Sequence, residues 1–315
     1  MNWLTNYVRP KIRQLVRPKD VPENLWVKCP QCGHMLFHKD FERTLRVCSR
    51  CGHHMRLPVR TRLVTLFDSG SFTYIELPQT QFDPLKFRDR KRYVDRLKEA
   101  QIQTGEDDAI IVAHGTMGGT PLVMAVFNID FLKGSMGLAV GEGLVAAAEL
   151  AVLQEAPLVV VSAAAGLRLQ EGILSLMQMA RTTVAVDNVK GKGLPFLVVL
   201  TDPTLGGVAA SFATLGDIVL AEPGAVIGFA GTRVVEQTIH EEIPKDFQRS
   251  EYLLAHGMLD MVVHRHQLRD ILIRLLKLLH HPLPSGEVID LPLRTEFPVP
   301  VEIPSSLPSL ASDSP

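Results

Sequence analysis

Two consecutive stretches of this chain of 315 residues repeat one construction: an apolar strand, a turn of small residues and the start of a helix. The first stretch covers residues 157–180 and has its turn at 162–166. The second covers residues 194–213 and has its turn at Gly206 and Gly207. Apolar, β-branched strands that alternate with helices indicate parallel strands joined by right-handed crossovers. The two units therefore predict an α/β fold.

The turn at Gly206 and Gly207 carries no ionisable side chain. From Pro203 to Gly216 the sequence contains no Asp, Glu, His, Lys, Arg or Cys. A strand that runs through glycines into a helix aims backbone N–H groups and the positive end of the helix at one place. The alternative is that small residues only allow close packing of helix on sheet, and for one turn alone the two interpretations are equally supported. Two such turns together favour an anion or oxyanion site made of main-chain amides.

All four cysteines lie in two Cys-x-x-Cys pairs, Cys29 with Cys32 and Cys48 with Cys51, and fifteen residues separate the pairs. Four thiolates at this spacing can surround one Zn²⁺ tetrahedrally, in a closed site with a structural role. Disulfides are rare in cytoplasmic proteins, and a redox pair needs only one Cys-x-x-Cys. We therefore predict a zinc ribbon. Four nearby histidines are competing ligands: His34, His38, His53 and His54.

Positive charge is concentrated near the N-terminus. Residues 1–60 contain 12 Lys and Arg against 4 Asp and Glu, a net charge of +8 in a chain whose net charge is −1. Nucleic acid, an acidic subunit or a cofactor phosphate fits this asymmetry, and a solvated basic face fits it equally. We find neither an apolar run long enough to cross a membrane nor a secretory signal, and expect a cytoplasmic protein that does not bind a membrane.

The region between the cysteines and the two units has its own elements. A charged surface helix is expected over residues 83–103, and a β-hairpin is expected where two apolar strands flank Gly118 and Gly119. The loop 131–137 carries Lys133, a candidate phosphate contact whose default interpretation is a solvated lysine. The tail after residue 281 is rich in Pro and Ser, and we expect it to be disordered.

Several short motifs follow one another over roughly residues 25–280. Besides the four-cysteine ribbon, they are Gly134-Ser-Met-Gly137, Arg168 with Gln170-Glu-Gly172, Thr201-Asp-Pro-Thr-Leu-Gly-Gly207, Ala221-Glu-Pro223, Ile227-Gly-Phe-Ala-Gly231, Val235-Glu-Gln237 and Phe247-Gln-Arg-Ser250. Together and in this order, they resemble the β subunit of bacterial acetyl-CoA carboxylase carboxyltransferase. The resemblance rests on the combination, because each motif alone is short.

The resemblance implies an α/β, crotonase-like superhelix of repeated ββα units, with an N-terminal zinc ribbon. It implies an α2β2 heterotetramer with the carboxyltransferase α subunit, working with biotin carboxylase and the biotin carboxyl carrier protein. The implied reaction transfers a carboxyl group from carboxybiotin on the carrier to acetyl-CoA. The product is malonyl-CoA, in the first committed step of fatty-acid synthesis. The implied domains are a lead-in (1–25), the ribbon (26–57), the carboxyltransferase domain (58–281) and the tail (282–315).

Such a reaction passes through an enolate, whose negative oxygen needs preorganised donors, each worth roughly 3 kcal/mol in comparable sites. The resemblance implies that biotin takes this proton after it releases CO2, so a site without a side-chain base fits. We assign the enolate oxygen to the amides of Gly206 and Gly207. Substrate contacts are expected from four further residues: Lys133, Ala165, Gly166 and Arg168.

One segment departs from the family pattern. Where the family usually has Ser-Gly-Gly-Ala-Arg-Met, this chain has Ala164-Ala-Gly-Leu-Arg-Leu169. If the turn needs a positive φ at Ala165, alanine is strained there by about 1 kcal/mol or more. Leu167, which is larger than alanine, is expected to narrow the pocket.

Two other classes of function compete with this hypothesis. A zinc ribbon on a basic N-terminal segment can bind nucleic acid, with the α/β body as a scaffold, although no interleaved aromatic residues indicate a strand-binding groove. A different acyl-CoA enzyme, such as a hydratase, would need a carboxylate near the glycine turn. Glu171 is the candidate for that carboxylate, and the alternative is that it interacts with a helix N-terminus.

Overall fold

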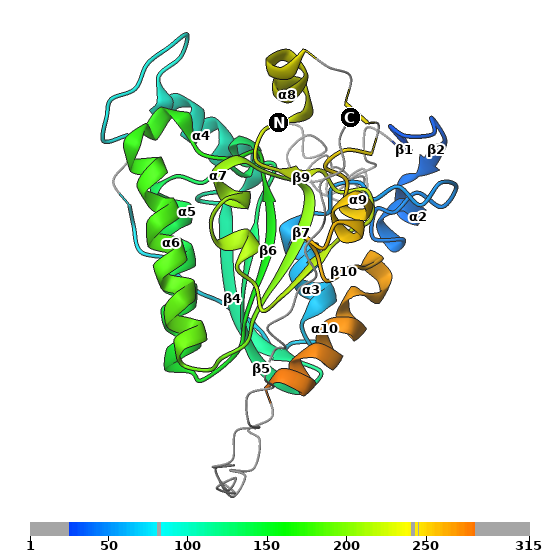
Figure 1. The fold of residues 1–315 in the computed structure, drawn as a ribbon, viewed down its shortest axis with the longest axis vertical. Coiled ribbons are helices and arrows are strands. Elements are labelled where there is room, and N and C mark those ends of the chain that lie inside the picture. Colours follow the sequence, from blue (N-terminus) through cyan, green and yellow to red (C-terminus); the bar gives the residue numbers. More distant parts are fainter. Residues whose placement is uncertain (1–24, 81–82, 241–242, 245, 281–315) are drawn as a thin grey trace, which may run out of the picture. The chain divides into compact units, whose positions relative to one another are not determined.

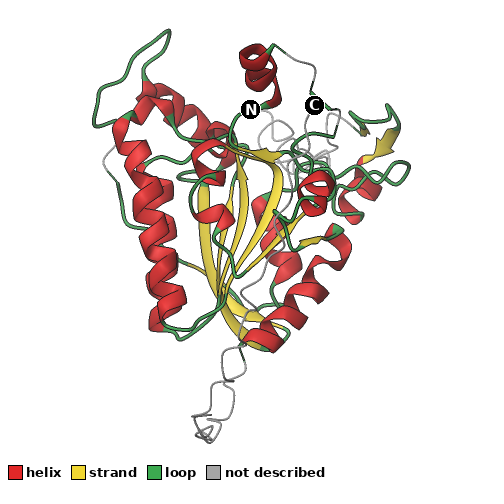
Figure 2. Cartoon of the chain, viewed as in Figure 1, coloured by secondary structure: helices red, strands yellow, loops and turns green. Residues whose placement is uncertain are grey.

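The computed structural model describes residues 25–80, 83–240, 243–244 and 246–280, and these are built around one sheet of eight strands (Figures 1 and 2). The strand order is β10-β8-β7-β6-β5-β4-β3, and β9 pairs with β7. Strands β5 to β8 and β10 run parallel, whereas β3, β4 and β5 are antiparallel. The strands are β3 Thr73–Tyr74, β4 Ile110–Met117, β5 Thr120–Phe127, β6 Leu158–Ala164, β7 Phe196–Leu205, β8 Ile218–Ala221, β9 Ile227–Gly228 and β10 Met261–Val262.

Helices cover both faces of this sheet, with α5 and α6 on one side and α3 and α10 on the other (Figure 1). Neighbouring residues of one strand serve opposite faces, so Val160 packs toward the first side and Val159 toward the second. The helices are α2 His38–Arg43, α3 Val59–Leu66, α4 Tyr93–Thr104, α5 Leu138–Leu153, α6 Ile173–Gly191, α7 Gly206–Ala209, α8 Thr232–Ile239, α9 Ser250–Ala255 and α10 Arg265–Leu279, with short 3-10 turns η2 Leu132–Gly134, η3 Leu169–Glu171 and η4 Phe212–Thr214.

Both predicted strand–turn–helix units are present. In the first, β6 leads into α6, and in the second, β7 leads into the short helix α7. The charged helix expected over residues 83–103 was placed wrongly at its start, because α4 begins only at Tyr93. Asp83 and Lys86 have positive φ angles of 46° and 52°, which a helix does not allow. Apart from residue 25, the predicted lead-in 1–25 lies outside the described residues, as does the predicted tail 282–315. Within the described residues, no helix has both the length and the apolar character needed to cross a bilayer.

The predicted hairpin is confirmed, with β4 and β5 paired from Ile110 and Phe127 to Met117 and Thr120. Its turn is held by Asp68, which precedes Gly118 by 50 residues. The carboxylate of Asp68 accepts hydrogen bonds from the backbone N–H groups of Gly118 (2.9 Å) and Gly119 (3.0 Å). These bonds lower the pKa of Asp68 to about 2.

We expect the substitution Asp68→Asn to lower the free energy of unfolding at neutral pH, because the amide replaces a charge-assisted acceptor. The folded-state pKa is depressed, so the contribution of Asp68 is present above its ordinary value of 3.8 and is lost as the pH falls toward about 2. The free energies of unfolding measured with urea for the wild type and for Asp68→Asn should therefore converge as the pH falls through this interval. A difference that stays constant down to pH 2 would contradict the assigned role.

Candidate active site

The four cysteine sulfurs lie within 4.8 Å of one another. The Sγ atoms of Cys29 and Cys51 are 3.7 Å apart, and those of Cys32 and Cys48 are 3.8 Å apart. A zinc ion with four Zn–S bonds of about 2.3 Å has sulfurs about 3.8 Å apart, since that is the edge of the tetrahedron. The four thiols thus fit a structural zinc and leave no position for a fifth ligand.

Local turns hold these sulfurs in place. The backbone N–H of Gly33 donates to the carbonyl of Cys29, and that of Gly52 donates to Cys48, both at 2.9 Å. Both glycines have positive φ angles, 70° and 72°, as expected for tight cysteine turns. The ribbon adds the two-stranded sheet of β1 Trp26–Lys28 and β2 Met35–Phe37.

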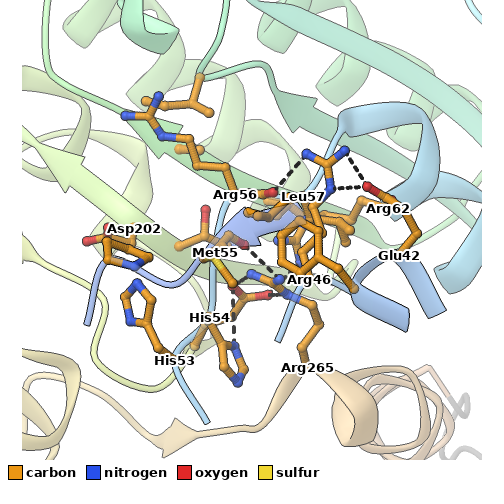
Figure 3. Close-up of a pocket in the computed structure, with 18 of the residues that line it drawn as sticks. Glu42, Arg46, His53, His54, Met55, Arg56, Leu57, Arg62, Asp202 and Arg265 are labelled. Carbon is orange, nitrogen blue, oxygen red and sulfur yellow. Dashed lines mark hydrogen bonds and ion pairs between the residues drawn. The ribbon is translucent and has the colours of Figure 1, made fainter. Parts of the chain in front are cut away.

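The ribbon is fastened to the body through the start of α10. The guanidinium group of Arg265 donates to the ribbon carbonyls of Leu45 (2.7 Å) and Met55 (2.9 Å). His266 Nε2 lies 2.8 Å from the carbonyl oxygen of Thr44. A cavity of about 500 Å³ separates ribbon and body beside this contact (Figure 3).

Glu222 is buried at the base of this contact. Its carboxylate accepts hydrogen bonds from Arg62 (2.8 Å) and from Arg265 (2.8 and 2.5 Å). Burial alone raises the pKa of Glu222, but the two guanidinium groups outweigh burial and hold the pKa well below its ordinary value. The ring of His54 lies in the same cluster, with Nδ1 3.7 Å from Glu222 Oε2. Among the described residues, neither ring nitrogen of His54 has a hydrogen-bond partner.

The two glycine-containing turns meet at the ends of β6 and β7. A Cβ atom built on Gly206 would lie 3.1 Å from the Cα atom of Gly166. Both residues have positive φ angles, 63° for Gly206 and 121° for Gly166. Glycine is therefore favoured at both positions by the backbone conformation as well as by the close approach of the two turns. The sequence predicted two turns of one kind, and the structure brings them side by side.

The hydrogen bonds of these two turns limit which backbone amides can act as oxyanion donors. The N–H of Gly206 donates to the carbonyl of Phe229 (2.9 Å), and that of Ala165 donates to Lys133 (3.0 Å). Both amides are occupied in this arrangement, which disfavours Gly206 as an oxyanion donor. Within the described part of the chain, the N–H groups of Gly166 and Gly207 have no acceptor, although both residues are buried. Buried amides without a partner are rare, so these two are the candidate donors.

The expected strain at Ala165 does not occur, because the positive φ falls on Gly166. Lys133 has an exposed side chain, and its backbone has a positive φ of 59° that bends the loop toward Ala165. Gly134, the next residue, crosses β6 so closely that a Cβ atom there would lie 2.0 Å from the carbonyl oxygen of Ala163.

Arg168, which we predicted as a substrate contact, is only 1% exposed, and its side-chain donors are satisfied within the protein. Its two terminal nitrogens donate to the Asp108 carboxylate at 2.8 and 2.6 Å. The remaining N–H groups reach Tyr93 Oη, the Ser135 hydroxyl and the Ser135 carbonyl. A guanidinium has five N–H donors, and all five are used here. Arg168 is therefore a positioning residue behind the turn at Gly166.

Glu171 completes this buried network. Its carboxylate accepts from Tyr93 Oη and from the backbone N–H of Leu138, both at 2.5 Å. Leu138 is the first residue of α5, so Glu171 does interact with a helix N-terminus, but that of α5 and not of α6. Asp108 and Tyr93 were not among the predicted site residues. The signal for them was weak, because both lie outside every motif that we singled out.

This combination of fold and site defines a class, the carboxyl transferases with a crotonase-like core, here carrying a four-cysteine ribbon. The family model of the carboxyl transferase domain matches residues 59–309, and that of the acetyl-CoA carboxylase zinc finger domain matches residues 26–51. The chain belongs to the family of acetyl-CoA carboxylase carboxyl transferase β subunits.

Curated relatives are similar to this chain over nearly their full lengths. The β subunit from Jannaschia sp. is 52% identical, over 100% of this chain and 97% of its own. That from Granulibacter bethesdensis is 58% identical, over 89% and 91%. Among solved structures, a Pseudomonas malonate decarboxylase hetero-tetramer in complex with malonate is 26% identical over 70% of this chain and 82% of its own, with a TM-score of 0.56. The transcarboxylase 12S structure, 24% identical over 70% and 41%, has a TM-score of 0.57 and supports the fold alone.

Proposed function

We propose that this chain, as the β subunit of an α2β2 carboxyltransferase, converts acetyl-CoA to malonyl-CoA with carboxybiotin as the carboxyl donor. Biotin arrives on the carrier protein, after carboxylation by biotin carboxylase, and supplies the carboxyl group. Family membership supports the reaction, and the four thiols support one structural zinc per subunit. We also retain the four proposed domains and a cytoplasmic location, where thiols stay reduced.

The observation that carries this proposal is the pair of buried amides at Gly166 and Gly207, which have no acceptor among the residues that the structure describes. Loss of a proton from the acetyl methyl group moves negative charge onto the thioester oxygen. Fixed N–H donors stabilise that charge without having to reorganise during the reaction. Since no ionisable side chain occurs from Pro203 to Gly216, the second turn acts through its main chain.

The remaining predicted contacts have separate roles in this proposal. Lys133 is exposed at the edge of the first turn, and we retain it as a contact for a phosphate of CoA. Ala165 is exposed too and forms the surface beside Gly166. Arg168 supports the turn from behind and touches no substrate.

The test removes one N–H and controls for the added Cβ atom. In a Leu167→Ala background, which makes room at position 207, Gly207→Pro is compared with Gly207→Ala. Both add a Cβ atom, and only proline lacks the N–H. We expect kcat for malonyl-CoA formation by the reconstituted complex to be about 10²–10³-fold lower for proline than for alanine. Zinc content and melting temperature of the two variants serve as controls.

Equal kcat values for the two variants would overturn the assignment of Gly207. Nucleic-acid binding is the second candidate, because residues 1–60 carry a net charge of +8. If the reconstituted complex forms no malonyl-CoA, while the chain alone binds RNA or DNA tightly and in a salt-sensitive manner, that candidate is favoured.

A further inference from the structure

We propose that Leu167 sets the size of the acyl group that the site accepts, restricting it to the acetyl group. This inference rests on the proposed function and deepens it. It concerns a side chain that lies between the two candidate amide donors: Leu167 follows Gly166 in the chain and touches Gly207 through space.

The contact with Gly207 is close. A Cβ atom at Gly207 would lie 2.6 Å from Leu167 Cγ and 2.7 and 2.9 Å from its two Cδ atoms. Real Cβ atoms do not approach other heavy atoms this closely, so the leucine side chain lies directly against the Cα of Gly207 and occupies the space beside it. The absence of a side chain at Gly207 is what lets Leu167 approach the second turn.

The backbone holds Leu167 firmly. Leu167 forms a parallel bridge with Met136, in which the Met136 N–H donates to Gly166 and the Arg168 N–H donates to Met136, both at 2.9 Å. The side chain of the next residue, Arg168, is fixed by its five hydrogen bonds. The side chain is half-buried and packs against the large core under α5 and α6. Leu167 is therefore a fixed wall of the site, unlike a mobile surface side chain.

The position of this wall determines what fits. A thioester oxygen held by the amides of Gly166 and Gly207 brings its acyl carbon next to the residue between them. The methyl of an acetyl group is the smallest acyl substituent, and every added methylene must share the space that Leu167 fills. A pocket wall discriminates against one extra methylene by about 10–200-fold in kcat/KM.

The test measures kcat/KM of the reconstituted holoenzyme with acetyl-CoA and with propionyl-CoA. We expect Leu167→Ala to raise the ratio of propionyl-CoA to acetyl-CoA by about tenfold or more. The matched control is Leu169→Ala, which removes the same atoms from an exposed leucine two residues further on and should leave the ratio unchanged. An unchanged ratio for Leu167→Ala, or an equal rise in both variants, would overturn the proposal.

A second measurement does not depend on activity. Gly207→Ala should lower the melting temperature by several degrees, because its Cβ meets Leu167, and adding Leu167→Ala should restore most of the loss. No restoration would show that the contact is not as described. A wild-type complex that makes no malonyl-CoA contradicts the proposed function, whereas an active complex with an unchanged substrate ratio contradicts only the role of Leu167.

Discussion

Removing zinc is expected to unfold the ribbon while the eight-stranded body stays folded. Within the described residues, the buried hydrophobic cluster of the ribbon consists of two of its own cysteines with Leu36 and Phe41. Zinc bound by four thiolates contributes about 10–16 kcal/mol to folding in small zinc modules, far more than two apolar side chains can supply. The body has two extensive cores of its own.

The measurement is limited proteolysis of the full chain after treatment with a chelator. Cleavage should appear within residues 26–51, the part matched by the zinc finger family, while the body resists. Added Zn²⁺ should restore protection, and Cys48→Ser should reproduce the effect without a chelator. A ribbon that stays protected in the zinc-free protein would show that packing alone stabilises it.

The second large effect is expected from Glu222→Gln. The change leaves the buried guanidinium groups of Arg62 and Arg265 without their counter-charge. Breaking a buried ion pair by removing one partner destabilises a protein by about 3–5 kcal/mol. Because Arg265 also holds two ribbon carbonyls, the ribbon should become more sensitive to protease in the same variant.

Chemical denaturation checks this, with Glu142→Gln as the matched control. Glu142 pairs with Arg181 at the surface (2.6 Å), and its loss should cost less than about 1 kcal/mol. The pKa of Glu222 is depressed in the folded state, so its contribution is present above the ordinary value of 4.5 and is lost as the pH falls below it. Equal effects of the two substitutions would contradict the role of Glu222.

Local patterns were enough to predict much of this molecule. The hairpin around Gly118 and Gly119 follows from two apolar strands and a glycine turn. The two strands that must pair are consecutive in the sequence. The four sulfurs converge because each Cys-x-x-Cys forms its own turn. The two strand–turn–helix units gave the α/β class for the same reason, since each is complete within about thirty residues.

What the sequence could not reveal depends on contacts between distant segments. The bond that occupies the Gly206 amide comes from Phe229, and the ion pair that buries Arg168 comes from Asp108. Each partner is delivered by the order of strands in the sheet and not by local spacing. A motif thus located the turn correctly but could not tell which of its amides were already occupied.

The attachment of Arg265 to Leu45 and Met55 joins segments 220 and 210 residues apart. During translation the ribbon leaves the ribosome early, and its cysteine turns can form as soon as they emerge. The residues of α10 that anchor the ribbon are synthesised only after the strands of the sheet. The Arg265 contacts that hold the ribbon therefore cannot form in a nascent chain that ends before α10.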